Sequence, residues 1–179
     1  MKLIKTKIQG VFIIENNKFE DSRGFFTESY NYLLFKKFIK SKFIQDNISL
    51  SKKKFTFRGL HFQKKPFQQS KLIRVDQGAI IDFILDIRRF SKTYLKIIMI
   101  KLTEKDLKQI YIPKGCAHGF LTLAPKTKVF YKVDNYYSKS HDAGYNILDK
   151  KISLKKLNKN SFFLSKKDKN LPFLNEKIK

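Results

Sequence analysis

The chain has 179 residues, and its 39 lysines and arginines against 15 aspartates and glutamates give a formal net charge of +24. Its 42% hydrophobic and 15% aromatic content excludes an intrinsically disordered chain. The single cysteine, Cys116, excludes an internal disulfide framework and fits a reducing, cytoplasmic setting. We therefore expect one folded, cytoplasmic domain over residues 1–179.

The excess of positive charge has two interpretations. One is a polyanionic partner, such as nucleic acid or an anionic membrane. The other is compositional bias, because the excess is nearly all lysine, and an AT-rich genome raises lysine, isoleucine, asparagine and phenylalanine together. A dedicated site usually concentrates charge on one element, often with arginine, whereas these lysines are spread along the chain. We favour compositional bias and expect neither a nucleic-acid nor a membrane partner.

The N-terminal part of the chain predicts a short helix and no export signal. The segment MKLIKTKIQGVFIIENN carries lysines but lacks the apolar run and small-residue cleavage site of a signal peptide. No stretch approaches the roughly 20 apolar residues of a spanning helix. Further along, Leu34, Phe35, Phe38 and Ile39 recur at helical spacing, which predicts a helix there.

The middle of the chain has the pattern of a β-protein. In residues 79–87, AIIDFILDI, alternate positions form one wholly apolar face, and the other face carries Asp82 and Asp86. Turn signals at residues 76–78 and 113–115 separate some of the predicted strands. Further strands are predicted at residues 71–75, 96–102, 109–112, 117–123 and 128–133. Many short strands at close spacing predict a sandwich or barrel.

Near the C-terminus, Ser165 followed three residues later by Asp168 resembles a capping box, which predicts the start of a second short helix. The expected fold is therefore mostly β, with small helices towards the ends.

Three histidines are candidates for chemistry, because histidine titrates near neutral pH and is the usual general base. His61 lies in FRGLHFQ, His118 in IPKGCAHGF, and His141 in the polar stretch SKSHDAG. The polar surroundings of His141 favour a surface or loop position.

The spacing Pro113-x-Gly115-x-x-His118 resembles the second sequence motif of cupins. Metal-binding cupins carry a His-x-His pair in the first motif, whereas the corresponding stretch here reads His61-Phe62-Gln63. A stable metal site needs three or four converging protein ligands, and two histidines are too few. We therefore expect no metal.

Seven segments together resemble the dTDP-4-dehydrorhamnose 3,5-epimerase family over nearly the whole chain. They are DSRGFFTE at 21–28, QDNIS at 45–49, FRGLHFQ at 57–63, QSKLIRVDQG at 69–78, IPKGCAHGF at 112–120, VFYK at 129–132 and LSKKD at 164–168. The resemblance implies a cupin-type jelly roll or β-sandwich, a dTDP-sugar substrate, and a homodimer in which an N-terminal strand crosses to the partner. It also implies cofactor-free epimerisation at C3 and C5 of dTDP-4-dehydro-6-deoxy-D-glucose, giving dTDP-4-dehydro-L-rhamnose.

The resemblance assigns four catalytic residues. Both reacting carbons flank a ketone, so removal of a proton gives an enolate, and return of a proton from the other face inverts the centre. His61 would be the base and Asp168 its carboxylate partner, while the ammonium of Lys71 would stabilise the enolate oxygen. Tyr131 would be the acid on the opposite face.

The resemblance also assigns residues to substrate binding, where cations suit a diphosphate and polar groups suit a base and a sugar. Phe25 or Phe26 could stack on the base. Asp142 stands where the family usually has glutamate. The assigned substrate-binding residues are Arg23, Glu28, Gln45, Asn47, Arg58, Lys71, His118, Asp142 and Lys167.

Other hypotheses stay open from the sequence. Each residue taken singly has a structural explanation: Asp168 as a cap, Lys71 as a surface lysine, Tyr131 as packing. The nearest enzyme alternatives are a single-centre epimerase and a 3,4-ketoisomerase acting on a related dTDP-4-keto-6-deoxy sugar. Alternatives of other classes are a basic nucleic-acid-binding protein and a cupin that binds sugar nucleotides without turnover. The nucleic-acid hypothesis gives no reason for the seven ordered segments.

Overall fold

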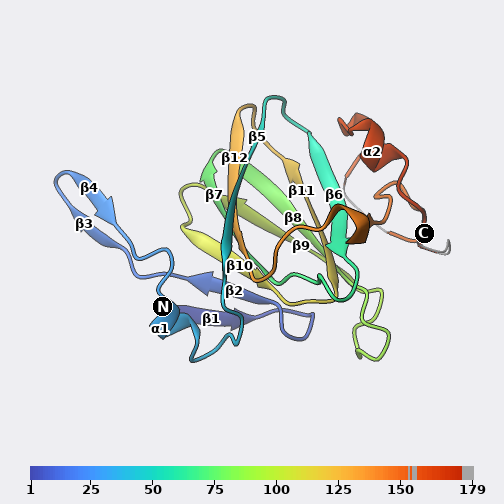
Figure 1. Ribbon diagram of the computed structural model, residues 1–179. Helices are drawn as coiled ribbons and strands as arrows, with labels where there is room; N and C mark the ends of the chain where they lie inside the picture. Colours follow the sequence, from blue (N-terminus) through green and yellow to red (C-terminus); the bar gives the residue numbers. More distant parts are fainter. Residues whose placement is uncertain (153, 155–156, 175–179) are drawn as a thin grey trace.

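The computed structural model describes residues 1–152, 154 and 157–174, and its main strands form two stacked antiparallel sheets (Figure 1). The first sheet has the strand order β1 (Lys2–Lys5), β2 (Phe12–Glu15), β10 (Lys108–Ile112), β7 (Lys71–Gln77), β12 (Thr127–Val133) and β5 (Gln45–Ser51). The second has the order β13 (Asp142–Gly144), β6 (Phe57–Gln63), β11 (Cys116–Thr122), β8 (Ala79–Asp86) and β9 (Ile97–Thr103). A separate hairpin pairs β3 (Phe19–Asp21) with β4 (Gly24–Phe26).

The chain alternates between the two sheets, which is the connectivity of a jelly roll. Strands β5, β6, β7 and β8 lie in the first, second, first and second sheet, and β9 to β12 alternate in the same way from the second sheet. The predicted mostly β sandwich is therefore confirmed. The alternation also sets β7 and β12 of one sheet against β6, β8 and β11 of the other.

The core between the sheets is built from the face of β8 that carries Asp82. Ile80 and Ile84 on that face are fully buried and pack with Ile73 and Val129 of the first sheet. Each such buried side chain contributes about 1.5–3 kcal/mol to stability. Asp82 lies between the two isoleucines, at 0% exposure, so a charged group is placed inside the sandwich.

The other face of β8 is covered by the C-terminal part of the chain. Phe83 and Leu85 pack in a second cluster with Ile147, Leu154 and Leu164. Both faces of this strand are therefore buried, because a segment without strands closes over the outer side of the second sheet. This segment also carries Asp168 back towards β6.

The strands and turns predicted from alternation are confirmed to within about two residues of their ends. Both predicted turns end in a glycine with left-handed backbone, Gly78 at φ 83° and Gly115 at φ 82°. Glycine adopts this conformation at no steric cost, which explains why the turns form there.

The helices are short. The first, α1 (Tyr32–Phe35), begins after Asn31, whose side chain accepts hydrogen bonds from the amides of Leu33 and Leu34. The helix predicted as far as Ile39 was wrong in its extent, although Phe35 and Ile39 are both buried.

The predicted C-terminal cap is confirmed. Helix α2 (Lys166–Lys169) begins after Ser165, whose Oγ accepts a hydrogen bond from the amide of Asp168 at 3.1 Å. Two 3₁₀ turns, η1 (Lys139–His141) and η2 (Lys159–Ser161), complete the elements.

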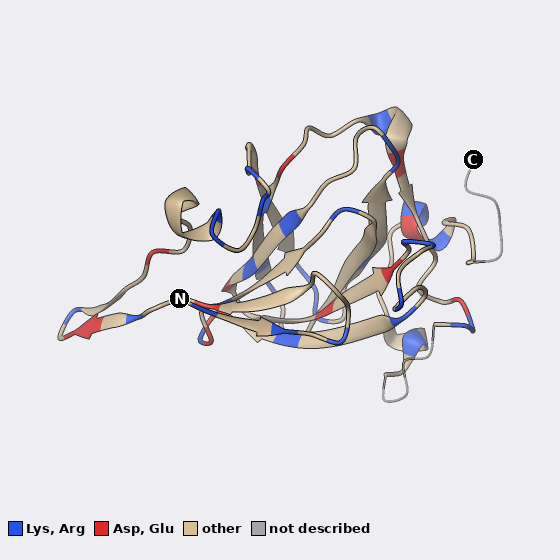
Figure 2. Ribbon diagram, turned by 90° about the horizontal axis from the view of Figure 1, so that it is seen from below, with Lys and Arg blue, Asp and Glu red and all other residues tan. Residues whose placement is uncertain are grey.

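Two surface features bear on partners. The β3–β4 hairpin projects from the sandwich (Figure 1), and its Phe19, Phe25 and Phe26 side chains are exposed. Lysines and arginines are scattered over both sheets, the loops and the hairpin (Figure 2). Among the described residues, the structure contains no helix with the length and apolarity needed to span a membrane.

Candidate active site

A close approach of two strands sets the positions of two histidines. Gly59 of β6 has a φ of +126°, and a Cβ at this position would lie 2.5 Å from the Cα of Gly119 on β11. Only glycine allows this contact. Next to it, His61 and His118 stand directly opposite each other across the two strands, and the register shifts between His118 and Phe120.

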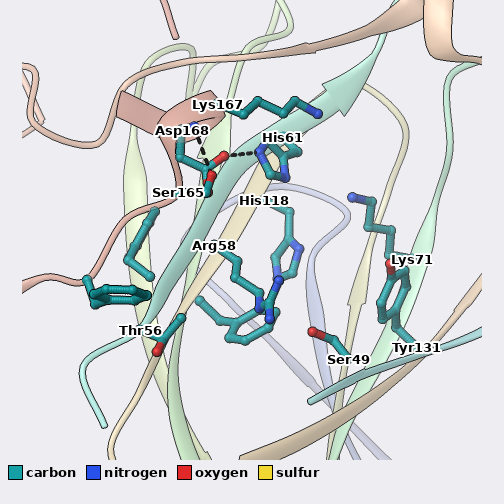
Figure 3. Close-up of a pocket in the computed structure, with 13 residues that line it drawn as sticks. Ser49, Thr56, Arg58, His61, Lys71, His118, Tyr131, Ser165, Lys167 and Asp168 are labelled. Atoms are coloured by element: carbon teal, nitrogen blue, oxygen red, sulfur yellow. Dashed lines mark hydrogen bonds and ion pairs between the residues drawn. The ribbon is translucent and has the colours of Figure 1, made fainter. Parts of the chain in front are cut away.

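These histidines line a cavity of about 400 Å³ between the two sheets (Figure 3). Its walls come from β5, β6, β7, β11 and β12 and from the segment around α2, so elements far apart in sequence meet here. The lining residues are Ser49, Thr56, Phe57, Arg58, His61, Lys71, His118, Phe120, Tyr131, Phe163, Ser165, Lys167 and Asp168.

His61 forms a dyad with Asp168. The two side chains are joined by a 2.6 Å contact between Nε2 and Oδ1, and the carboxylate side chain is 5% exposed. Burial opposes ionisation of Asp168, but the contacts with His61 and Ser165 outweigh it and lower the pKa of this carboxyl. Because a carboxylate only accepts, Nε2 of the neutral imidazole carries the proton and Nδ1 keeps a free lone pair. The dyad therefore has the geometry of a general base held in one tautomer.

Lys71 and Tyr131 lie across the cavity from Asp168 (Figure 3). Burial lowers the pKa of Lys71 to about 8, against the opposing effect of Asp82 and Asp142, so the side chain is mainly an ammonium at neutral pH. Burial raises the pKa of Tyr131, against the opposing effect of Arg58, so its phenol keeps its proton. One cavity thus holds a base, a cation and a proton donor.

This arrangement suits the chemistry of a carbon acid. The imidazole can take a proton from a carbon next to a carbonyl, the ammonium can bind the oxygen that becomes negative, and the phenol can return a proton. Within the described ranges, no three His, Cys, Asp or Glu side chains come together in a way that could hold a metal ion.

Besides Lys71, the cavity holds three of the residues predicted to bind substrate, namely Arg58, His118 and Lys167. Arg58 is fixed against β5 by two hydrogen bonds of 3.0 Å. Its Nε donates to the Ser51 hydroxyl, and its Nη2 donates to the Leu50 carbonyl. His118 faces the interior, and Lys167 lies at the rim in an ion pair with Asp142. Asp142 itself does not line the cavity.

The other predicted residues lie farther away. Gln45 and Asn47 alternate with Ser49 on one face of β5 and are joined by a 2.8 Å hydrogen bond, so they extend the polar wall beyond the cavity lining. Arg23 lies on the projecting hairpin and is paired with Asp21. Glu28 precedes α1 and accepts a hydrogen bond from Asn31. The structure does not bring these last two residues to the cavity of their own chain.

Several lining residues were missed by sequence reasoning. Ser49 could have been found, because it continues the alternation of Gln45 and Asn47. Thr56 and Phe163 meet through an isolated parallel bridge between distant segments, for which the sequence carries no signal. Ser165 was identified only as a helix cap.

Comparisons with known proteins agree with this geometry. The family model described as dTDP-4-dehydrorhamnose 3,5-epimerase matches residues 5–176. A protein of that description from Escherichia coli (strain K12) is 39% identical over 181 residues, covering 100% of this chain and 97% of the relative.

Solved structures are also similar. A dTDP-4-dehydrorhamnose 3,5-epimerase from Bacillus anthracis str. Ames, with TDP and PPi bound, superposes with a TM-score of 0.93 at 45% identity, covering 97% of this chain and 99% of that one. An epimerase from Legionella pneumophila Philadelphia 1, in complex with dTDP-4-keto-L-rhamnose, has a TM-score of 0.91 at 34% identity, covering 97% and 93%.

Proposed function

The chain belongs to the dTDP-4-dehydrorhamnose 3,5-epimerase family, and from this membership we propose how its cavity inverts two carbons of a dTDP-sugar. The enzyme is an isomerase that converts dTDP-4-dehydro-6-deoxy-D-glucose to dTDP-4-dehydro-L-rhamnose. The observation that carries the proposed mechanism is that His61, Asp168, Lys71 and Tyr131 line one cavity, with the carboxylate of the dyad and the phenol on different sides.

In the first step, Nδ1 of His61 takes the proton from C3 of the ketosugar. The electron pair of the broken C–H bond moves into the enolate, and the negative charge settles on the oxygen at C4. Asp168 stabilises the imidazolium that forms, because it already accepts from Nε2. The Lys71 ammonium binds the enolate oxygen; one preorganised donor of this kind contributes about 3–4 kcal/mol.

In the second step, Tyr131 gives its proton to the carbon from the opposite face, and the centre is inverted. The phenolate then regains a proton, His61 loses one to solvent, and the same sequence acts at C5. Because burial favours the neutral phenol, Tyr131 begins each cycle in the donor form.

The remaining polar groups would bind the substrate. We assign Arg58 and Lys167 to the diphosphate, since both are cations at the cavity and guanidinium forks suit phosphate oxygens. His118 is assigned to the sugar. Gln45 and Asn47 would extend the contact along β5, and Asp142 would orient Lys167 through their ion pair.

We further propose that the active form is a homodimer, in which Arg23 and Glu28 serve the neighbouring subunit's site. Two features of the chain support this. The hairpin that carries Arg23 projects from its own sandwich with three exposed phenylalanines (Figure 1). The edge strand β5, next to the cavity, exposes Ile48 and Leu50. Apolar edges of this kind are usually covered by a partner.

The function is tested by incubating the purified enzyme with dTDP-4-dehydro-6-deoxy-D-glucose in deuterium oxide and locating the label by NMR. We expect deuterium at both C3 and C5 and a product of L-rhamno configuration. Exchange at one carbon only would indicate a single-centre epimerase, and movement of the ketone to C3 would indicate a ketoisomerase. Exchange at neither carbon would refute the proposal.

The pH dependence of kcat/KM is expected to have an alkaline limb that begins near pH 8. Lys71 stabilises the enolate only as an ammonium, and burial places its pKa at about 8. Above that pH, the fraction of enzyme with a charged Lys71 decreases, approaching a tenfold decrease for each further pH unit. Initial rates measured from pH 6 to 10 would check this. Activity that stays constant up to pH 10 would contradict a catalytic role for the Lys71 charge.

A further inference from the structure

Asp82 is a buried carboxylate that the proposed mechanism does not use. It lies on the inner face of β8, diagonal to His118 on β11, and is 0% exposed. Its Oδ1 is 2.6 Å from Nε2 of His118. Its Oδ2 is buried and has no hydrogen-bond partner among the described residues. A buried carboxylate oxygen without a partner is rare and unfavourable, so it calls for a physical reason.

His118 does not neutralise this carboxylate. Burial lowers the pKa of the imidazole, and the positive charge of Lys71 lowers it further, while Asp82 opposes both. The imidazole is therefore neutral near pH 7 and donates a hydrogen bond from Nε2 without contributing charge.

The charged and titratable groups around Lys71 come from several elements. Asp142 of β13 is already paired with Lys167, and Asp168 is engaged by His61. The other titratable groups that line the cavity are Arg58 and His61 of β6, His118 of β11, Tyr131 of β12 and Lys167 of α2.

Asp82 does not line the cavity itself but lies directly behind the lining residue His118, and in the described part of the chain no lysine or arginine is bonded to it. It attracts the half-buried ammonium of Lys71, which does line the cavity. We propose that Asp82 is a positioning residue with two effects: Oδ1 orients His118 towards the sugar, and the charge on the free Oδ2 keeps the Lys71 side chain an ammonium at neutral pH. The inference rests on the proposed function in one respect, namely that the ammonium is what the enolate requires. This role explains why a carboxylate with an unsatisfied oxygen is kept inside an apolar core. Without Asp82, burial would shift Lys71 towards its neutral amine form.

The test measures the protonation of Lys71 directly, without substrate. The full-length enzyme is pulse-labelled with acetic anhydride at a series of pH values, and acetylation of the peptide that contains Lys71 is measured by mass spectrometry. Only the neutral amine reacts, so the half-labelling pH reports its pKa. For the unsubstituted enzyme we expect half-labelling near pH 8. In Asp82→Asn, which keeps an oxygen to accept from His118, we expect a half-labelling pH lower by at least about 1 unit.

The matched control is Asp106→Asn, which removes the same charge from an exposed loop between β9 and β10. We expect it to leave the half-labelling pH of Lys71 unchanged. An equal shift in both variants would show a general effect of net charge and would overturn the inference. No shift in Asp82→Asn would overturn it as well.

Activity provides a second readout that a purely structural role would not reproduce. In Asp82→Asn, the alkaline limb of kcat/KM should move to lower pH by the same amount as the labelling curve, with activity recovering as the pH is lowered. A uniform loss at every pH, with labelling unchanged, would mean that Asp82 only supports folding and would overturn the inference. If Asp82→Asn does not fold, the labelling curve of the unsubstituted enzyme still tests the inference. Half-labelling of Lys71 below pH 7 would show that Asp82 does not keep this side chain an ammonium and would overturn the inference. Labelling does not depend on turnover, so failure of this inference and failure of the proposed function give different results.

Discussion

Replacing His61 with asparagine is expected to lower kcat/KM by about 10³-fold and to abolish deuterium uptake at both carbons. Asparagine is polar and of similar size, but it has no nitrogen that can accept a proton at neutral pH. A general base usually contributes about 10²–10⁴-fold, and here the same imidazole serves both carbons. Because Asp168 remains in place, the change removes the base and leaves the rest of the cavity intact. Initial rates and NMR detection of the label would measure the effect.

The matched control is His141→Asn, in a residue that lies on η1 and bonds to Ser138 and Ser140 outside the cavity. Its kcat/KM should stay within about twofold of the original enzyme, since it supplies no group to the proposed chemistry. Retained deuterium uptake in His61→Asn would contradict the role of His61. Equal losses in both variants would point to the fold instead of the base.

Replacing Tyr131 with phenylalanine is expected to reduce product formation by about 10²–10³-fold while leaving the affinity for dTDP unchanged. Removal of one oxygen preserves the packing of the ring on β12 but deletes the proton that inverts the centre. His61 can still remove the proton and return a deuteron to the same face. Substrate recovered from deuterium oxide should therefore carry label without inversion, which NMR detects.

The comparison variant is Tyr94→Phe, in an exposed tyrosine of the loop between β8 and β9, which should behave as the original enzyme. Isothermal titration with dTDP separates binding from turnover. If affinity for dTDP fell as far as turnover does, Tyr131 would be a binding residue and the assignment as acid would be wrong.

The elements that were predicted well are those determined by local pattern. Period-two alternation located β8, and the turns at Gly78 and Gly115 followed from a glycine in a left-handed conformation. The cap at Ser165 followed from a hydroxyl three residues before an acidic residue. The extent of α1 could not be predicted from the spacing of apolar residues. Phe35 and Ile39 are buried, but Phe38 is 58% exposed, because burial here depends on contacts with the sheet and not on helical spacing.

The burial of β8 on both faces also required tertiary information. Alternation distinguished an apolar face from a face with Asp82 but did not indicate which of the two faces the other sheet. In the structure the acid lies inside the sandwich, because the C-terminal segment covers the apolar face with Ile147, Leu154 and Leu164. The sequence separation involved leaves no local signal.

The four catalytic residues could be proposed only as a set and only through the resemblance to a known family. Lys71 and Tyr131 carry no individual signal, and Asp168 alone has the pattern of a cap. The structure brings all four side chains to one cavity, which supports the assignment that the resemblance implied. Asp82 had no motif to identify it; its importance follows from burial and from an oxygen left without a partner.

The contact between Gly59 and Gly119 fixes the positions of the two histidine-bearing strands relative to each other. Main chain lies against main chain at that point, so the backbone positions of His61 and His118 do not depend on how side chains pack between the two strands. Any larger residue would spread the two strands and displace both rings together. In such a scaffold, substitutions at the edges of the cavity can change its lining without moving these two strands.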